Sequence, residues 1–202
     1  MRDIYVYDGT DVLINKFDER NVDNLARLES EYTSTAIAEL FESPIKGNFD
    51  EFHLQEIHRK IFCELFSWAG EFRKVNIEKP EAVLNGLSVE YADVLDIRKE
   101  LHSIFKRMRN AKWNINKETN VILLCKYLTE VWKVHPFREG NTRTTMFFFY
   151  EYMDSLNIDL DTKLLSDNAE YVRTALVAAS FEMPDVCERN YSYLEKIINE
   201  EI

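Results

Sequence analysis

The chain has 202 residues, a formal net charge of −11 and a hydrophobic fraction of 46%. This length is enough for one domain with a sizeable core. The acidic balance argues against non-specific DNA or RNA binding, which needs a basic surface, although a local basic pocket can still hold one nucleotide. No apolar run approaches the ~18 residues of a membrane span, and no signal peptide precedes the first helix. We therefore expect neither a nucleic acid nor a membrane as partner.

The three cysteines, Cys63, Cys125 and Cys187, are far apart and lie in apolar, helical surroundings. An odd number of scattered cysteines predicts free, buried thiols rather than disulfides, which is typical of a reducing, cytoplasmic environment. No Cys-x-x-Cys pair or Cys/His cluster predicts a zinc site.

In chain order, residues 1–20 are predicted to form a short arm with a turn at Asp8-Gly9-Thr10. Apolar residues recur at helical spacing over 21–41, and Pro44 ends that helix because the residue before a proline avoids helical geometry. Asp50 is expected to cap a second helix that stops at Ala69-Gly70.

Residues 71–89 are the part of the chain that resembles strand. Phe72, Val75 and Ile77 alternate with polar neighbours, and Asn85-Gly86 is a strong turn signal. We predict a short β-hairpin here, and because two strands alone are marginally stable it should lean on the helical body.

Helical periodicity returns at about 90–109, 117–134, 141–157, 166–181 and 185–201. The apolar run Phe147-Phe148-Phe149-Tyr150 in the third of these helices is expected to be core. Helix then makes up roughly two thirds of the chain, well above the usual third. The expectation is an all-α fold with one hairpin, in a single domain over 1–202. A core of about 45–160 would carry an N-terminal arm and helix, 1–43, and C-terminal helices, 161–202.

The segment from His135 to Arg143 holds the densest set of reactive side chains. One helix must end near His135, which Pro136 follows, and another starts near Asn141. The start of a helix presents free N–H groups and the positive end of its dipole, so it favours anions. Gly140 allows close approach of a ligand to the backbone. Together with Arg138 and Arg143, which suit phosphate oxygens, the loop predicts a phosphate site.

Glu139 is an acid in this basic loop. A Mg²⁺ held by one carboxylate and by phosphate oxygens would account for it. His135 stands at the mouth of the loop, where it can take a proton from an attacking hydroxyl.

The segment His135-Pro-Phe-Arg-Glu-Gly-Asn-Thr-Arg is similar to the Fic-domain signature, His-x-Phe-x-(Asp/Glu)-Gly-Asn-Gly-Arg-x-x-Arg. Tyr5-x-Tyr-x-Gly-Thr, the segments 48–50 and 57–62, and Trp68-Ala69-Gly70-Glu71-x-Arg73 resemble the usual lead-in, so the resemblance covers roughly residues 4–160. It implies a helical Fic fold and a protein adenylyltransferase that moves AMP from ATP, with Mg²⁺, to a Ser, Thr or Tyr hydroxyl of a target protein. Self-AMPylation is expected too.

The resemblance also implies residue roles. His135 would be the general base, Phe137 would pack into the core and fix the loop, and Glu139 would bind Mg²⁺. The ATP-binding set would be Arg138, Gly140, Asn141, Thr142 and Arg143. A flap that holds the target as an added strand would comprise Val75, Asn76, Ile77 and Glu78.

Two positions depart from the signature: Thr142 replaces a glycine and Met146 replaces the second arginine. A Cβ at residue 142 crowds or reshapes the place where backbone approaches phosphate. Doc-type toxin kinases, which bind ATP reversed, have Lys at the position of Thr142. A phosphotransferase with reversed ATP, a transferase of another nucleotide and a non-catalytic nucleotide-binding module are therefore open alternatives.

Many relatives carry an inhibitory helix with the pattern Ser/Thr-x-x-x-Glu-Gly/Asn. Thr35 and Glu39 have this spacing on one helical face, although Leu40 follows them. They are candidate inhibitory residues, with a solvated surface pair as the alternative. A small inhibitory partner protein and a homo-oligomer formed through the terminal helices also remain open.

Overall fold

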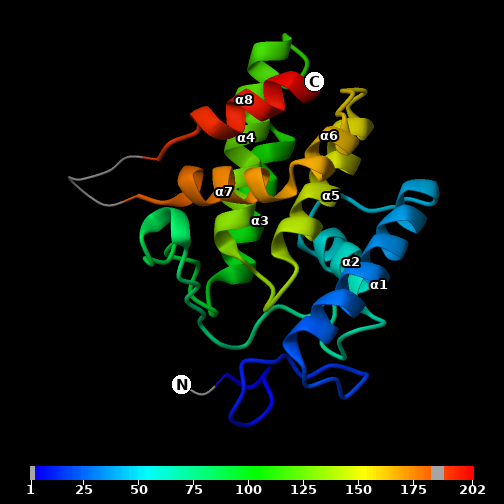
Figure 1. Ribbon diagram of the computed structural model, residues 1–202. Helices are drawn as coiled ribbons and strands as arrows, with labels where there is room; N and C mark the ends of the chain where they lie inside the picture. Colours follow the sequence, from blue (N-terminus) through cyan, green and yellow to red (C-terminus); the bar gives the residue numbers. More distant parts are fainter. Residues whose placement is uncertain (1–2, 183–188) are drawn as a thin grey trace.

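A computed structural model describes residues 3–182 and 189–202, and its regular elements are helices (Figure 1). They are α1 (Val22–Glu42), α2 (Glu51–Phe62), the 3₁₀ turn η1 (Ala82–Leu84), α3 (Ile97–Arg109), α4 (Lys117–Val134), α5 (Asn141–Ser155), α6 (Thr162–Asp167), α7 (Ala169–Ser180) and α8 (Ser192–Glu201). Within these residues, β pairing is limited to an isolated antiparallel bridge between Val6 and Leu13. The predicted all-α class is confirmed.

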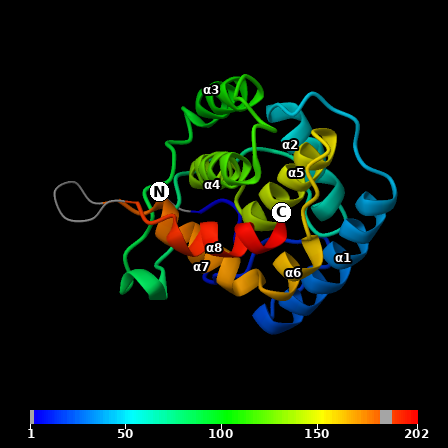
Figure 2. The same cartoon turned by 90° about the horizontal axis from the view of Figure 1, so that it is seen from above.

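Helix α4 is the centre of the fold, and α3, α5, α7 and α8 pack against it. Figure 2 looks down on the molecule and shows α4 almost end-on between these neighbours. Its side chains are buried on several faces, as the apolar stripe predicts. The buried positions are Asn120, Val121, Leu124, Cys125, Tyr127, Leu128, Thr129, Val131, Trp132 and Val134.

The starts of α1, α2 and α4 have a local cause. The side chains of Asn21, Asp50 and Asn116 accept hydrogen bonds from backbone N–H groups in the first turns of α1, α2 and α4. Such caps satisfy donors that the helix itself leaves unpaired. The cap predicted at Asp50 is confirmed.

The hairpin predicted over 71–89 is wrong as a pair of strands. Its turn does form: Asn85 and Gly86 both have positive φ, 54° and 88°, and Leu87 N donates to Leu84 O over 3.1 Å. However, η1 lies directly before that turn, and Asn76 of the expected first strand is bonded through its side chain to Asp93 and Val94. The segment is thus an irregular loop, because side chains take backbone groups that a ladder would use: Lys74 N donates to Tyr5 OH and Lys79 N to Ser88 Oγ, both over 3.0 Å.

Other predicted boundaries shift by up to two helical turns, and the second helix ends at Phe62 rather than at Ala69-Gly70. The helix expected from residue 90 begins at Ile97, and the one expected at 166–181 is divided into α6 and α7. Part of the segment predicted as helix over 185–201, including Cys187, lies outside the described residues. Cys63 and Cys125 are free thiols, as predicted, but of these two Cys125 is buried and Cys63 is half-buried, so the predicted burial is wrong for Cys63. No helix among the described residues is long and apolar enough to cross a membrane.

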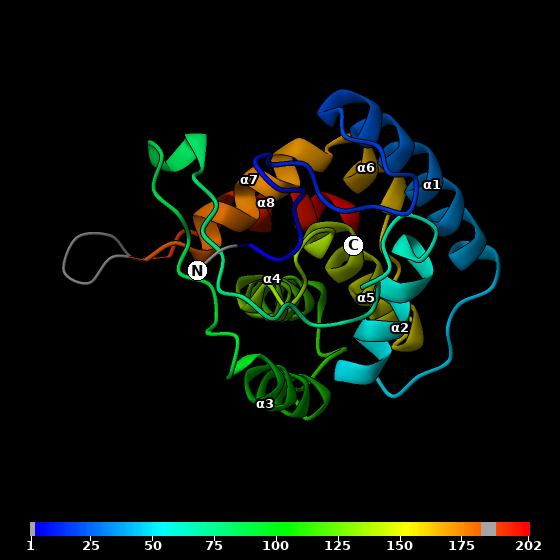
Figure 3. The same cartoon turned by 90° about the horizontal axis from the view of Figure 1, so that it is seen from below.

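The lower end of α4 is covered by chain from two distant parts of the sequence. Figure 3, seen from below, shows the N-terminal arm and the irregular segment after α2 crossing this end. The loop between α4 and α5 is bonded to the segment after α2, since Arg73 N donates to Pro136 O over 2.8 Å. This is where the predicted reactive segment sits.

Candidate active site

His135 ends α4 in a left-handed conformation, with φ 49°. Its backbone N–H still bonds to Trp132 O at 3.0 Å, so the chain leaves the helix at this residue. Pro136 prevents the helix from continuing. A histidine at positive φ is uncommon and needs support from its surroundings.

The His135 side chain is only 4% exposed and is held as a neutral base. Its Nδ1 lies 3.3 Å from Trp132 O, so Nδ1 carries the proton and Nε2 keeps a lone pair. Within residues 3–182 and 189–202, Nε2 has no hydrogen-bond partner. Burial, followed by the charge of Lys79, lowers the pKa of His135 well below its usual value. The Tyr91 ring covers the imidazole, with ring centroids 4.1 Å apart.

Arg73 is the clamp that holds this helix end. Its guanidinium is 2% exposed, and its Nε donates to His135 O over 2.9 Å. The remaining donors reach the carbonyls of Val134, Val75 and Ala92. A single buried side chain therefore joins the end of α4 to the loop after α2, and it satisfies carbonyls that α4 leaves unpaired.

A second set of contacts, around Phe137, shapes the rest of the loop. Phe137 N donates to Asn141 Oδ1 over 2.9 Å, and Asn141 Nδ2 donates back to Phe137 O over 2.8 Å. The Phe137 ring stacks on His58, with centroids 3.8 Å apart. His58 Nδ1 accepts the Gly70 N–H over 2.8 Å, so its Nε2–H donates to Glu139 O over 3.1 Å. Phe137 is thus buried, and it fixes the loop as the sequence indicates.

Gly140 starts α5 with φ 77°, and a Cβ there would lie 2.1 Å from the Phe62 ring. Only glycine meets both demands at no cost. No described side chain caps this helix, so the N–H groups of its first turn are available to a ligand. The geometry is that of an anion site at a helix N-terminus.

Glu139 is held ionised beside this helix start. Burial opposes its ionisation, but Lys79, with Nζ 3.2 Å from the carboxylate, and the Gly140 N–H bring its pKa down to about 2. Among the described residues no group of three or more His, Cys, Asp or Glu side chains is arranged to hold a metal ion. One ionised carboxylate fits a Mg²⁺ that takes its other ligands from phosphates and water, rather than a metal caged by protein.

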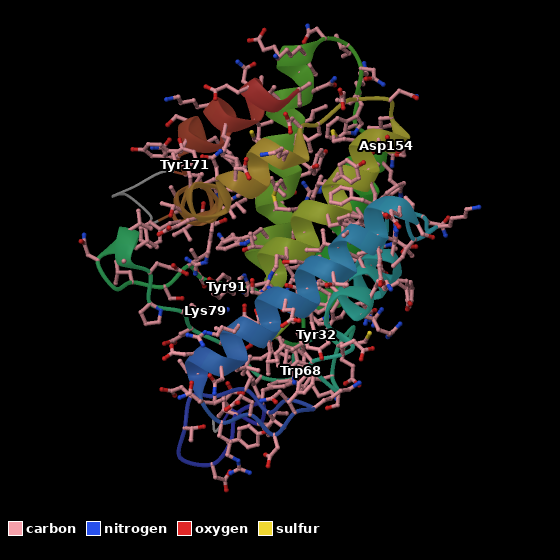
Figure 4. All side chains as sticks on the ribbon, turned by 45° about the vertical axis from the view of Figure 1, so that its right-hand side comes forward. Tyr32, Trp68, Lys79, Tyr91, Asp154 and Tyr171 are labelled. Carbon is pink, nitrogen blue, oxygen red and sulfur yellow. The ribbon has the colours of Figure 1, made fainter. Side chains whose placement is uncertain are left out.

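These groups share one cavity of about 360 Å³. Figure 4 labels two residues of the loop between α2 and α3 that lie beside α1 in this view: Lys79, which lines the cavity, and Tyr91, whose ring lies against His135. The lining residues come from four parts of the fold: Lys79, His135, Glu139, Gly140, Asn141, Thr142, Arg143, Ala169, Glu170 and Arg173.

Arg143 lines this cavity but is engaged by α1. It donates to Thr33 Oγ1 over 3.0 Å and forms an ion pair with Glu29. The predicted inhibitory pair lies elsewhere: Glu39 bonds Lys60 at 2.5 Å, and the Thr35 hydroxyl donates to a carbonyl of its own helix. The carboxylate of α1 that meets the motif is therefore Glu29, not Glu39.

Two other predicted ATP-binding residues are placed differently from expectation. The Arg138 guanidinium pairs with Asp3 at 2.8 Å and lines a separate cavity of about 260 Å³. This second cavity includes all four predicted flap residues, Val75, Asn76, Ile77 and Glu78. Thr142 lines the first cavity, but its Oγ1 accepts the Trp132 Nε1–H over 2.9 Å, so its hydroxyl is held by the protein. Met146 faces an apolar cavity of about 200 Å³.

Sequence reasoning gave no role to Arg73, His58, Glu29 or Lys79. Arg73 and His58 stand in the segments that resemble the lead-in, and that position was their only signal. Their partners lie 62 and 81 residues away, which no local pattern encodes.

Comparison with known proteins identifies the same family that the signature at 135–143 resembles. Residues 48–153 match the Fic/DOC family model. The protein adenylyltransferase VbhT of Bartonella schoenbuchensis is 27% identical over 79% of this chain and 32% of its own length, and a probable protein adenylyltransferase Fic of Escherichia coli is 27% identical over 73% and 70%. The chain spans about a third of the length of VbhT and of a second Bartonella relative.

Solved structures show the same fold. BepC of Bartonella tribocorum, crystallised with AMPPNP, superposes with a TM-score of 0.80 at 20% identity, over 98% of this chain and 95% of that one. The family match covers more than half of the chain and includes the whole loop from His135 to Arg143. The chain belongs to the Fic/DOC family.

Proposed function

We propose that this chain is a protein adenylyltransferase, which transfers AMP from ATP to a Ser, Thr or Tyr hydroxyl of a target protein and also to itself. The observation that carries the proposal is a neutral His135 on the wall of a cavity that also holds the start of α5; among the described residues its Nε2 has no hydrogen-bond partner and no side chain caps α5. The relatives named protein adenylyltransferase and the neighbour with AMPPNP support this choice of reaction and donor.

The reaction would run as an in-line displacement at the α-phosphorus. The target hydroxyl gives its proton to His135 Nε2 as its oxygen attacks, the bond from the α-phosphorus to the bridging oxygen breaks, and pyrophosphate leaves. The N–H groups of the first turn of α5 and the Arg143 guanidinium would stabilise the negative charge at the phosphates. The Nδ1–H bond to Trp132 O fixes the tautomer that leaves the Nε2 lone pair free to accept a proton, and burial lowers the pKa of His135 so that the ring is neutral at neutral pH.

Glu139 is the residue that would hold Mg²⁺, together with the phosphates of the nucleotide. Bound there, Mg²⁺ would neutralise phosphate charge and orient the leaving group. Lys79 occupies that carboxylate in the structure, so Lys79 would move toward phosphate when nucleotide and metal enter together.

Residues 75–78 would dock the target. They pair with no other strand among the described residues and lie over the cavity that holds Arg138. An extended segment of the target can add to such an edge through backbone hydrogen bonds.

A phosphotransferase with reversed ATP stays the second candidate, because the position of Met146 offers no cation. Met146 lies in a largely apolar cavity with Ile37, Phe41 and Val172, among others, so its own side chain adds no charge partner for the far phosphate beside Arg143, which also lines this cavity.

The deciding experiment is intact-mass spectrometry of the protein after incubation with ATP and Mg²⁺, beside a His135→Ala variant. One added AMP that is missing in the variant supports the proposal, and one added phosphate supports the reversed pose. If neither mass appears, calorimetry with ATP follows: no binding contradicts the proposal, whereas binding without transfer directs the search to an external target.

A further inference from the structure

Arg173 of α7 reaches the cavity of His135 from outside the matched family segment, which ends at residue 153. Arg173 also forms an ion pair with Glu81, in the loop that follows the flap residues 75–78. Its Nη1 and Nη2 donate to the two carboxylate oxygens of Glu81 over 2.9 and 2.8 Å. A two-pronged arginine–carboxylate pair is the geometrically most specific ion pair that proteins make.

The pair is unequal in burial. The Glu81 side chain is 4% exposed, whereas that of Arg173 is 45% exposed. A buried carboxylate is stable only with a partner, and Arg173 is the ion-pair partner that the described residues provide. Without Arg173, the carboxylate of Glu81 would gain by turning to water.

Glu81 is also the backbone hinge of its loop. Its N–H donates to Leu87 O over 3.0 Å, and its carbonyl accepts from Leu84 and Gly86. The rest of the loop is held less deeply: η1 contains no buried residue, and its half-buried Leu84 packs on the core where η1 contacts α7. A movement of Glu81 therefore moves the whole of 79–88.

The flap residues 75–78 lie between this hinge and the Arg73 clamp. At the near end, the carbonyl of Val75 accepts from the fully buried Arg73. At the far end comes Lys79, whose Nζ contacts Glu139, and then Glu81. The first anchor is deep in the core and the second is a half-exposed ion pair, so the second limits how firmly the flap is held.

We propose that Arg173 is a positioning residue: through Glu81 it anchors the far end of the flap, and it thereby governs target docking while leaving nucleotide affinity nearly unchanged. The docking half of this inference rests on the proposed adenylyltransferase function. The anchoring half concerns the backbone alone.

Hydrogen exchange by mass spectrometry tests the anchor in the protein without ligand. Arg173→Ala should raise exchange of the amides over 77–88 by about tenfold or more, because it leaves a buried carboxylate unpaired, while α4 and α5 keep their protection. Arg107→Ala is the matched control: Arg107 also forks onto a carboxylate, that of Glu130, and is 47% exposed, but it lies on α3. It should leave 77–88 unchanged.

A second variant separates charge from packing. Glu81→Gln combined with Arg173→Ala should recover part of the protection that Arg173→Ala loses, since no carboxylate is left to draw the loop into water. Unchanged exchange in Arg173→Ala, or no recovery in the double variant, overturns the anchor.

The part of the proposal that concerns target docking is tested by two measurements, the ATP Kd and the initial rate of self-AMPylation. Calorimetry should give Arg173→Ala an ATP Kd within about twofold of the parent, while the initial rate of self-AMPylation falls about tenfold. A parallel loss of ATP affinity would assign Arg173 to the nucleotide and overturn the proposal. A parent that adds no AMP contradicts the proposed function instead, and the exchange data still decide the anchor.

Discussion

Acid should destabilise this fold through His58 before it reaches the carboxylates. His58 is fully buried between the rings of Phe62 and Phe137, and burial lowers its pKa to about 3. Its Nδ1 accepts the Gly70 N–H, so a second ring proton would point directly at that donor. The folded state therefore keeps His58 neutral.

The direction in which stability changes with pH follows from proton uptake on unfolding. The unfolded chain binds a proton at this histidine below pH ~6.5, the folded chain only near pH 3, so unfolding takes up a proton and stability falls as pH falls. Each unit of pH below ~6.5 costs about 1.4 kcal/mol, which gives about 2 kcal/mol at pH 5. For a chain of this size the same loss lowers the Tm by roughly 4–8 °C.

Urea unfolding followed by circular dichroism, between pH 7.5 and 5.0 and without Mg²⁺ or nucleotide, measures this loss. His58→Gln removes the titrating group, while the buried His135 and all other groups remain in both proteins. The variant will be less stable at pH 7.5, but its stability should fall by about 2 kcal/mol less than that of the parent on going to pH 5. Equal slopes for the two proteins would refute the reasoning.

Three further changes test the site. Arg73→Met removes a buried guanidinium that satisfies several carbonyls, so the free energy of unfolding in urea should drop by about 3 kcal/mol or more, against little change for Arg107→Met. Gly140→Ala places a Cβ against the Phe62 ring at positive φ; about 2 kcal/mol of stability should be lost, with ATP affinity by calorimetry falling too. Glu29→Gln frees Arg143 and should tighten ATP binding by about 3- to 10-fold, whereas an unchanged Kd would show that the ion pair does not compete with phosphate.

How far the sequence predicts the fold is shown by α4 and by the failed hairpin. Helix α4 spans 117–134 as predicted, since its apolar stripe, the Asn116 cap and Pro136 all act within a few residues. The strands predicted over 71–89 fail although their turn forms, because Asn76 bonds to Asp93, 17 residues away, and takes up the backbone of Val94. Alternation predicts which residues face inward, not which partner takes the backbone bonds.

In the site, too, local features were predicted from the sequence and long-range contacts were not. The signature predicted six of the residues that line the cavity, namely His135 and Glu139 to Arg143, because a histidine before proline and a glycine before a helix are local features. It did not predict the partners: Arg143 meets Glu29 across 114 residues of sequence, and Arg138 turns to Asp3 across 135. Those contacts depend on how α1 and the N-terminal arm pack on the loop.

Every cation that lines the cavity is already paired with a carboxylate: Lys79 with Glu139, Arg143 with Glu29, and Arg173 with Glu81. Each pair joins a different part of the chain to the site, namely the flap segment, α1 and α7. Under the proposed function, a triphosphate that entered with Mg²⁺ would replace the first carboxylate at no loss of charge balance, since Glu139 would hold the metal and Lys79 would turn to phosphate. The other two exchanges leave Glu29 or Glu81 without a partner. Because Glu81 is the more deeply buried of these two carboxylates, its pair should persist when nucleotide binds, and α1 is then the element that nucleotide displaces most readily.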